Sequence, residues 1–182
     1  MSTTDANQAL LVVDVVNPLD FPGGKQLLAQ ALPVVRSIAR LKRRLKARGV
    51  PVVYVNDNFT HWRCDFRELV AICTQPGVLG APLAQALPPE HDDYLVLKPK
   101  HSGFFASPLE VLLRQLQVGH VVVTGIAGDG CVLSTAADAH MRDFTVSVPS
   151  DCCASITAVR NQHALALLRQ SLDLDTRASR NL

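Results

Sequence analysis

Hydrophobic positions follow two patterns along the chain, and the two patterns alternate. Short continuous runs of branched apolar residues are typical of strands buried on both faces of a parallel sheet. Strands are predicted around such runs, over residues 9–16, 50–56, 93–97, 118–124 and 144–148. Between them, apolar residues at helical spacing predict helices over residues 32–48, 66–73, 107–116, 131–142 and 161–172. The alternation predicts an α/β fold, a three-layer α/β/α sandwich around a mostly parallel, doubly wound, Rossmann-like sheet.

Proline and glycine residues set the expected limits of several elements. Pro33 suits a first helical turn better than a helix interior, so the first helix is expected to begin near Leu32. Residues 75–92 contain four prolines and two glycines and are predicted to form a loop or a lid. Residues 175–182 are expected to add a short edge strand or to remain irregular. No change in composition marks a boundary, so residues 1–182 are predicted to form one domain.

Composition and charge narrow the class of protein. A formal net charge of +2 is too small to predict nucleic-acid binding. No apolar run approaches the roughly 20 residues that span a bilayer, and the polar first residues lack the features of a secretory signal. Five cysteines without a CxxC pair favour free thiols in a reducing compartment over a disulfide framework or a zinc site. We therefore expect a cytoplasmic protein with no membrane or nucleic-acid partner.

The stretch from Val118 to Met141 places a cysteine where a strand turns into a helix. Branched residues stop at Gly125, a glycine-containing turn follows, and Cys131 is predicted to be the first residue of a helix. Unpaired backbone N–H groups and the helix dipole at that position favour a thiolate over a thiol. The same N–H groups can hold a developing oxyanion. The working hypothesis is a cysteine hydrolase with Cys131 as its nucleophile.

Two charged residues are predicted to reach the same place as this thiol. Asp14 lies near the end of the first apolar run, and Lys98 lies at the end of the third. The carboxyl ends of neighbouring strands meet at one edge of a doubly wound sheet. There, Lys98 would keep Asp14 ionised and favour the thiolate, while Asp14 would take the thiol proton and return it to a leaving group. The alternative for Asp14 is an ordinary loop or N-cap carboxylate.

Four segments resemble those of a known family, and together they cover nearly the whole chain in order. They are LLVVDVVNPLDF at 10–21, VVYVNDNF at 52–59, VLKPKHSGFFASPL at 96–109 and VVTGIAGDGCVLSTAADAHMRDFTVSVPSDCCAS at 122–155. The chain resembles the isochorismatase-like cysteine hydrolases, a family that includes nicotinamidases, carbamoylsarcosine amidohydrolases and ureidoacrylate amidohydrolases.

This resemblance implies a catalytic triad of Asp14, Lys98 and Cys131. It also implies a cis peptide bond between Ile126 and Ala127, which turns the Ala127 N–H toward the Cys131 N–H to form an oxyanion hole. About six parallel strands and a homodimer or homotetramer are implied as well. The expected reaction cleaves a C–N bond of a small amide, ureide or carbamoyl compound through a thioester on Cys131. Isochorismatases themselves cleave a vinyl ether and need no cysteine nucleophile.

One departure from the family pattern concerns a metal. Nicotinamidases carry a metal-binding Asp-x-His after the second strand, whereas Asp57 is followed here by Asn58 and Phe59, and His61 is displaced by two positions. We therefore expect no bound zinc and no other cofactor, and we expect hydrolysis of a small amide other than nicotinamide. Without a metal, Asp57 is expected to hydrogen-bond the substrate or to hold its own loop in place.

Loops at this edge of the sheet carry residues expected to contact a small-molecule substrate in a partly aromatic pocket. These residues are Phe21, Asp57, Trp62, His101 and Phe104. For Phe104, packing in the core is an equal alternative.

Two other functions are compatible with parts of the sequence. A dinucleotide-binding domain would use Gly125, Gly128 and Gly130 after a strand, with Asp151 about 20 residues further on. The spacing is GxxGxG rather than GxGxxG, however, and this interpretation leaves Cys131 without a role. The second alternative is a non-catalytic member of the same fold, which binds a small molecule without catalysing a reaction.

Overall fold

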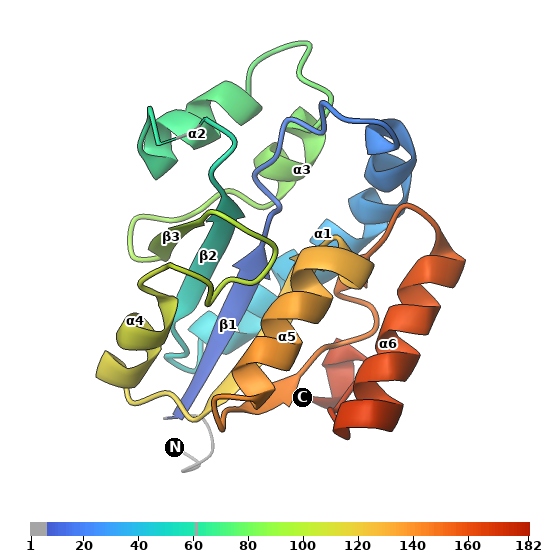
Figure 1. The fold of residues 1–182 in the computed structure, drawn as a ribbon. Coiled ribbons are helices and arrows are strands. Elements are labelled where there is room, and N and C mark those ends of the chain that lie inside the picture. Colours follow the sequence, from blue (N-terminus) through green and yellow to red (C-terminus); the bar gives the residue numbers. More distant parts are fainter. Residues whose placement is uncertain (1–6, 61) are drawn as a thin grey trace.

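The computed structural model describes residues 7–60 and 62–182, and within them six parallel strands form a central sheet (Figure 1). Strands β3, β2, β1, β4 and β5 follow one another across the sheet, and β6 pairs with β4. Their bounds are β1 Gln8–Val13, β2 Val52–Asp57, β3 Tyr94–Lys98, β4 His120–Ile126, β5 Thr145–Ser147 and β6 Cys153–Ala154. Each pair of neighbouring strands runs parallel, which confirms the predicted sheet.

Helices cover both faces of this sheet and complete the predicted α/β/α sandwich (Figure 1). They are α1 Gly24–Lys46, α2 Phe66–Cys73, α3 Ala81–Ala86, α4 Leu109–Gln115, α5 Leu133–His140 and α6 Ala158–Leu172. A π-helical turn, η2 (Gly128–Val132), precedes α5, and a 3-10 turn, η3 (Ser179–Asn181), follows α6. Over the part of the chain described, none of these helices combines the length and the apolar character needed to span a bilayer.

Alternate side chains of the central strand β1 enter the two halves of the core. Leu10 and Val12 pack in the cluster that holds the buried residues of α1, α2 and α3. Leu11 and Val13 pack in the other cluster, against α4, α5 and α6. All four side chains are fully buried, as a parallel sheet covered on both faces requires. Removal of such surface from water, at about 25 cal/mol per Å², is the main stabilising effect.

The first helix is longer than predicted. α1 begins at Gly24, and Pro33 lies inside it rather than in its first turn. A proline in a helix removes the hydrogen bond that its N–H would give to the carbonyl four residues earlier, here that of Ala29. Pro33 and Ala29 are both exposed, so solvent can satisfy that carbonyl and the helix continues across the proline.

Two further elements differ from the prediction. The segment 75–92 contains the helix α3 as well as loop, and Pro82 lies at its start, where a missing N–H costs little. The sixth strand, β6, lies before α6 and pairs with the end of β4. Residues 175–182 were expected to add an edge strand or to remain irregular; in them Asp175 forms an isolated bridge with Ser147, and Ser179–Asn181 form η3.

Strand β4 runs two residues beyond its predicted end at Thr124, and Gly125 makes this possible. Gly125 pairs with Val13 of β1. Its φ of +119° favours glycine, and a Cβ at this position would lie 2.0 Å from the Val13 carbonyl oxygen. The close approach keeps the ends of β1 and β4 side by side, and these ends lead directly into the segments that contain Asp14 and Cys131.

Candidate active site

Asp14 follows β1 directly, in a backbone conformation that few residues adopt. Its φ is +53°, in the left-handed region that aspartate tolerates better than most side chains do. The residue is 4% exposed, and its Oδ1 accepts a hydrogen bond of 2.6 Å from the backbone N–H of Asp57. A buried carboxylate needs such partners, so the end of β2 holds the Asp14 side chain in place.

Lys98 ends β3 and is fully buried. Its Nζ lies 2.8 Å from Asp14 Oδ2, 3.0 Å from the carbonyl oxygen of Lys100 and 3.5 Å from Cys131 Sγ. Each of the three ammonium hydrogens therefore has an acceptor. The structure thus brings together the carboxylate, the ammonium and the thiol that the strand ends were predicted to share.

Cys131 lies within the turn η2, between β4 and α5, rather than at the first residue of an α-helix as predicted. The N–H groups of Gly130 and Val132 close this turn by donating to the Ala127 carbonyl, at 3.0 and 3.1 Å. The peptide bond between Ile126 and Ala127 is cis. The turn leaves the Cys131 thiol partly exposed, so a substrate can approach it.

The surroundings of the Cys131 thiol favour its protonated form. Burial and the negative charge of Asp14 raise the pKa of Cys131 to about 12, although Lys98 acts in the opposite direction. Burial also raises the pKa of Asp14, against the effect of Lys98. Burial lowers the pKa of Lys98, but Asp14, Cys131 and Asp57 together more than offset this, and the net shift is upward. These effects oppose the expected resting thiolate, so a sulfur that attacks a substrate would need a proton acceptor.

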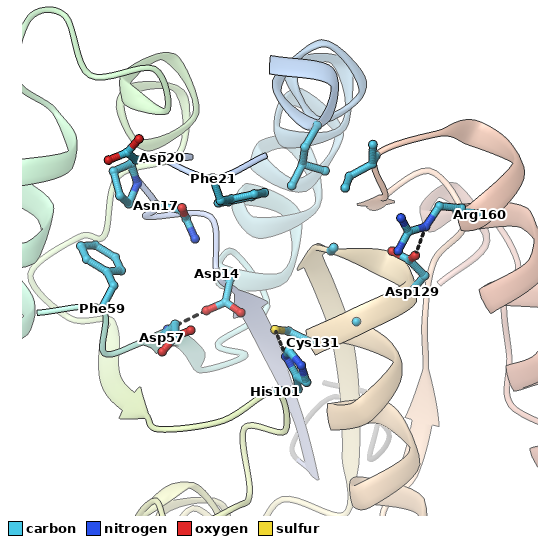
Figure 2. Close-up of a pocket in the computed structure, with 15 residues that line it drawn as sticks. Asp14, Asn17, Asp20, Phe21, Asp57, Phe59, His101, Asp129, Cys131 and Arg160 are labelled. Carbon is cyan, nitrogen blue, oxygen red and sulfur yellow. Dashed lines mark hydrogen bonds and ion pairs between the residues drawn. The ribbon is translucent and has the colours of Figure 1, made fainter. Parts of the chain in front are cut away.

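A cavity of about 480 Å³ opens beside the sulfur (Figure 2). It is lined by Asp14, by Cys131 and by three of the residues predicted to contact substrate, Phe21, Asp57 and His101. Nδ1 of His101 lies 3.5 Å from Cys131 Sγ. Figure 2 shows the Phe21 ring facing this space from the segment that follows β1. The volume is that of a site for a small molecule.

Two of the predicted substrate contacts lie elsewhere. Trp62 is 61% exposed and does not belong to the described lining of the cavity. Phe104 is 5% exposed, and its ring packs on Phe144 with 5.8 Å between the ring centroids. The guanidinium of Arg142 covers the Phe104 ring as well. Phe104 therefore belongs to the core, in the buried cluster that also contains residues of α4 and α5.

The cavity also contains residues that the sequence pattern did not single out. Asp129 belongs to η2, and its carboxylate pairs with Nε of Arg160. The position of Asp129, two residues before the thiol, was a usable signal. Arg160 had none, because α6 starts three residues earlier than its predicted start at 161 and carries Arg160 in its first turn. The remaining lining residues are Asn17, Pro18, Asp20, Leu27, Phe59, Gly130 and Ile156, together with Ala127 from the predicted oxyanion hole.

The metal site of the nicotinamidase pattern would lie at this same edge of the sheet. Across residues 7–60 and 62–182, no group of three or more His, Cys, Asp or Glu side chains is placed to hold a metal ion. Two residues after Asp57, where the nicotinamidase pattern has histidine, the apolar ring of Phe59 lines the cavity. The donor set therefore does not fit that metal site. His61, the displaced histidine, lies outside the described residues.

The fold and the site together define a doubly wound α/β protein with a thiol-centred pocket at the carboxyl edge of its sheet. The family model of the isochorismatase domain matches residues 8–174. YaaI, an uncharacterised isochorismatase family protein of Bacillus subtilis (strain 168), is 36% identical over 167 residues, which cover 92% of this chain and 91% of YaaI. The chain belongs to the isochorismatase family, and the resemblance of its four segments is confirmed.

Solved structures share the fold. An isochorismatase-like hydrolase from Alkaliphilus metalliredigens superposes with a TM-score of 0.77 at 23% identity, covering 97% of this chain and 94% of that chain. The nicotinamidase of Staphylococcus aureus gives a TM-score of 0.66 at 23% identity, covering 94% of this chain and 99% of that chain. At these identities the likeness establishes the architecture alone, so the activity has to be argued from the site.

Proposed function

We propose that the protein is a cysteine hydrolase that cleaves a C–N bond of a small amide, ureide or carbamoyl compound through a thioester on Cys131. One observation carries the proposal. The buried ammonium of Lys98 bonds the Asp14 carboxylate at 2.8 Å and lies 3.5 Å from the Cys131 sulfur, beside an open cavity. Burying a carboxylate and an ammonium costs free energy, and a protein that only binds its ligand would not need both against a thiol.

The first half of the reaction uses Asp14 as a base and then as an acid. A thiol with a pKa of about 12 does not ionise by itself at neutral pH, so Asp14 accepts the Cys131 proton as the sulfur attacks the carbonyl carbon. The N–H groups of Ala127 and Cys131 hold the oxyanion, and losing one such donor costs about 3 kcal/mol in comparable sites. Asp14 then protonates the departing nitrogen, and water hydrolyses the thioester.

The cavity walls support a substrate rich in N–H groups. Carboxylates of Asp20 and Asp57 line the cavity and can accept hydrogen bonds from an amide, a ureide or a carbamoyl group. The rings of Phe21 and Phe59 line it as well and supply apolar contact. A small polar compound with one apolar face fits this combination.

A screen of small amides and ureides for ammonia release tests the proposal. We expect the wild-type protein to release ammonia from at least one compound, and Cys131→Ala to lower that rate by at least about a thousandfold. Cys64→Ala is the matched control, because Cys64 is partly exposed outside the cavity lining, and its rate should equal the wild-type rate. Substantial turnover by Cys131→Ala would refute the nucleophile. Failure of every compound would favour the non-catalytic alternative.

A further inference from the structure

His101 is a second group beside the sulfur that can exchange a proton with it. It lies in the loop after β3, is exposed, and lines the cavity. Its Nδ1 is 3.5 Å from Cys131 Sγ, the same separation as that of Lys98 Nζ. Figure 2 shows Asp14 and His101 on different sides of the sulfur. The thiol therefore has a buried carboxylate on one side and an exposed imidazole on the other.

Hydrolysis of the thioester, the second half of the reaction, requires two proton transfers in the site. Water must lose a proton as its oxygen attacks the acyl carbon, and the sulfur must gain a proton as the C–S bond breaks. Because burial and Asp14 raise the pKa of Cys131 to about 12, its thiolate leaves slowly unless a proton reaches it. A single group that takes the proton from water and passes it to the sulfur satisfies both demands.

We propose that His101 is this group, an inference that rests on the proposed thioester chemistry. In the neutral imidazole, Nδ1 carries the lone pair when Nε2 carries the proton. Nδ1 accepts a proton from the attacking water while the new C–O bond forms. The C–S bond of the tetrahedral intermediate then breaks, its electron pair stays on sulfur, and the imidazolium returns the proton to that sulfur. The products are the free acid, the Cys131 thiol and neutral His101, so no other reactant is consumed.

Other charged groups near the sulfur are less suited to this role. Among the described residues, the other charged side chains that line the cavity are Asp14, Asp20, Asp57, Asp129 and Arg160. Lys98 lies beside the sulfur, and Lys100 belongs to the loop of His101. Lys98 has no lone pair and its three hydrogens are engaged, while Asp129 is paired with Arg160. Asp14 is the competing acceptor, so the experiment must separate His101 from Asp14.

p-Nitrophenyl acetate separates the two halves of the reaction, because nitrophenolate leaves without a proton. Acetylation of Cys131 releases nitrophenolate in a burst, and hydrolysis of the acetyl thioester sets the later steady rate. In His101→Asn, we expect a burst rate within about twofold of the wild-type burst rate and a steady rate lower by about 100-fold. Mass spectrometry of the acid-quenched variant should show the acetyl group accumulating on Cys131. His140→Asn, at the exposed end of α5, is the matched control and should behave as wild type.

The dependence on pH provides a second readout. The wild-type steady rate should fall on acidification, because a protonated imidazole has no lone pair for the water proton, and His101→Asn should lack this fall. His101 is exposed, so its substitution leaves the core unchanged, and His101→Gln should repeat the result in a second side chain.

The outcomes are distinct. A steady rate in His101→Asn equal to the wild-type rate, with the same pH profile, would show that Asp14 serves both halves and would overturn the inference. If the burst rate and the steady rate fell in parallel in both His101→Asn and His101→Gln, His101 would have a positioning role, and this result would also overturn the inference. Failure of the proposed function looks different, because Cys131→Ala would then release nitrophenolate as fast as the wild-type protein does.

Discussion

In the proposed reaction, Asp14 acts on the thiol in two opposite ways, as the acceptor of its proton and as a nearby negative charge. We expect Asp14→Asn to lower turnover by at least about 100-fold. The same change should lower the pKa of Cys131, because the charge that helps to raise it to about 12 is removed. Iodoacetamide reacts with the thiolate, so alkylation of Cys131 near about pH 8, followed by peptide mass, should be faster in the variant than in the wild-type protein.

Asp173→Asn is the matched control for this experiment. Asp173 is exposed at the end of α6, in a left-handed conformation that asparagine also adopts. Turnover and alkylation should both stay at the wild-type values in this control. Slower alkylation in Asp14→Asn would mean that the carboxylate stabilises the thiolate, contrary to the charge argument made for the site.

The three candidate catalytic residues could be predicted from the sequence because each lies at the end of a strand or in the segment that directly follows one. The rule that parallel strands end at one edge of a sheet indicated that Asp14, Lys98 and Cys131 would meet, and the family resemblance implied the same three residues. The direction of a loop side chain could not be predicted in this way. Phe104 turns into the core because Phe144 offers it a buried ring contact, and that contact is created by tertiary packing. The protonation of the thiol also depends on burial, which the local sequence does not specify.

Gly125 controls how closely the strands β1 and β4 approach at the site. A Cβ here would lie 2.0 Å from the Val13 carbonyl oxygen, in addition to the strain of a φ of +119°. Gly77 has a φ of +86° with nothing within 4 Å of its Cβ position, so Gly77→Ala isolates the strain. We expect Gly77→Ala to lower the free energy of unfolding by about 1 kcal/mol and Gly125→Ala to lower it by about 1–3 kcal/mol more. Urea denaturation measures both, and equal losses would show that the close approach is unimportant.

Elements with a strong local pattern could be predicted, and those fixed by their neighbours could not. The branched runs locate five strands, and α2 has the bounds that its sequence predicts. The strand β6 has two residues and exists because it pairs with the end of β4. The start of α1 that was predicted from Pro33 is too late, because an exposed proline can be tolerated within a long helix that packs along its other face.

The layered architecture could be predicted at the scale of the whole molecule, since continuous apolar strands require helices on both faces. The contacts that join the C-terminal region to the rest of the fold could not. Ser179, in η3, donates its N–H and its hydroxyl to Asp151 at 2.6 and 2.8 Å. Its carbonyl accepts a hydrogen bond from Arg44, near the end of α1. Polar contacts between segments this far apart leave no periodic signal in the sequence.

These contacts should make part of the stability depend on pH. Burial tends to raise the pKa of Asp151, but the hydrogen bonds from Ser179 lower it, and the net shift is downward. A carboxyl group with a lowered folded-state pKa stabilises the fold above its unfolded value of about 4, and this effect is lost as pH falls through the folded value. Acidification below about pH 4 should therefore weaken the attachment of η3.

Ser179→Ala tests this dependence, because it removes one of the two hydrogen bonds to Asp151. We expect the variant to lower the free energy of unfolding by about 1 kcal/mol at neutral pH. The difference from the wild-type protein should shrink below about pH 4, where Asp151 becomes protonated in both proteins. Ser171→Ala, on the exposed surface of α6, is the matched control and should change stability little at either pH. Urea denaturation across this range measures the effect, and a Ser179→Ala loss that stays constant on acidification would show that the Asp151 charge does not act through Ser179.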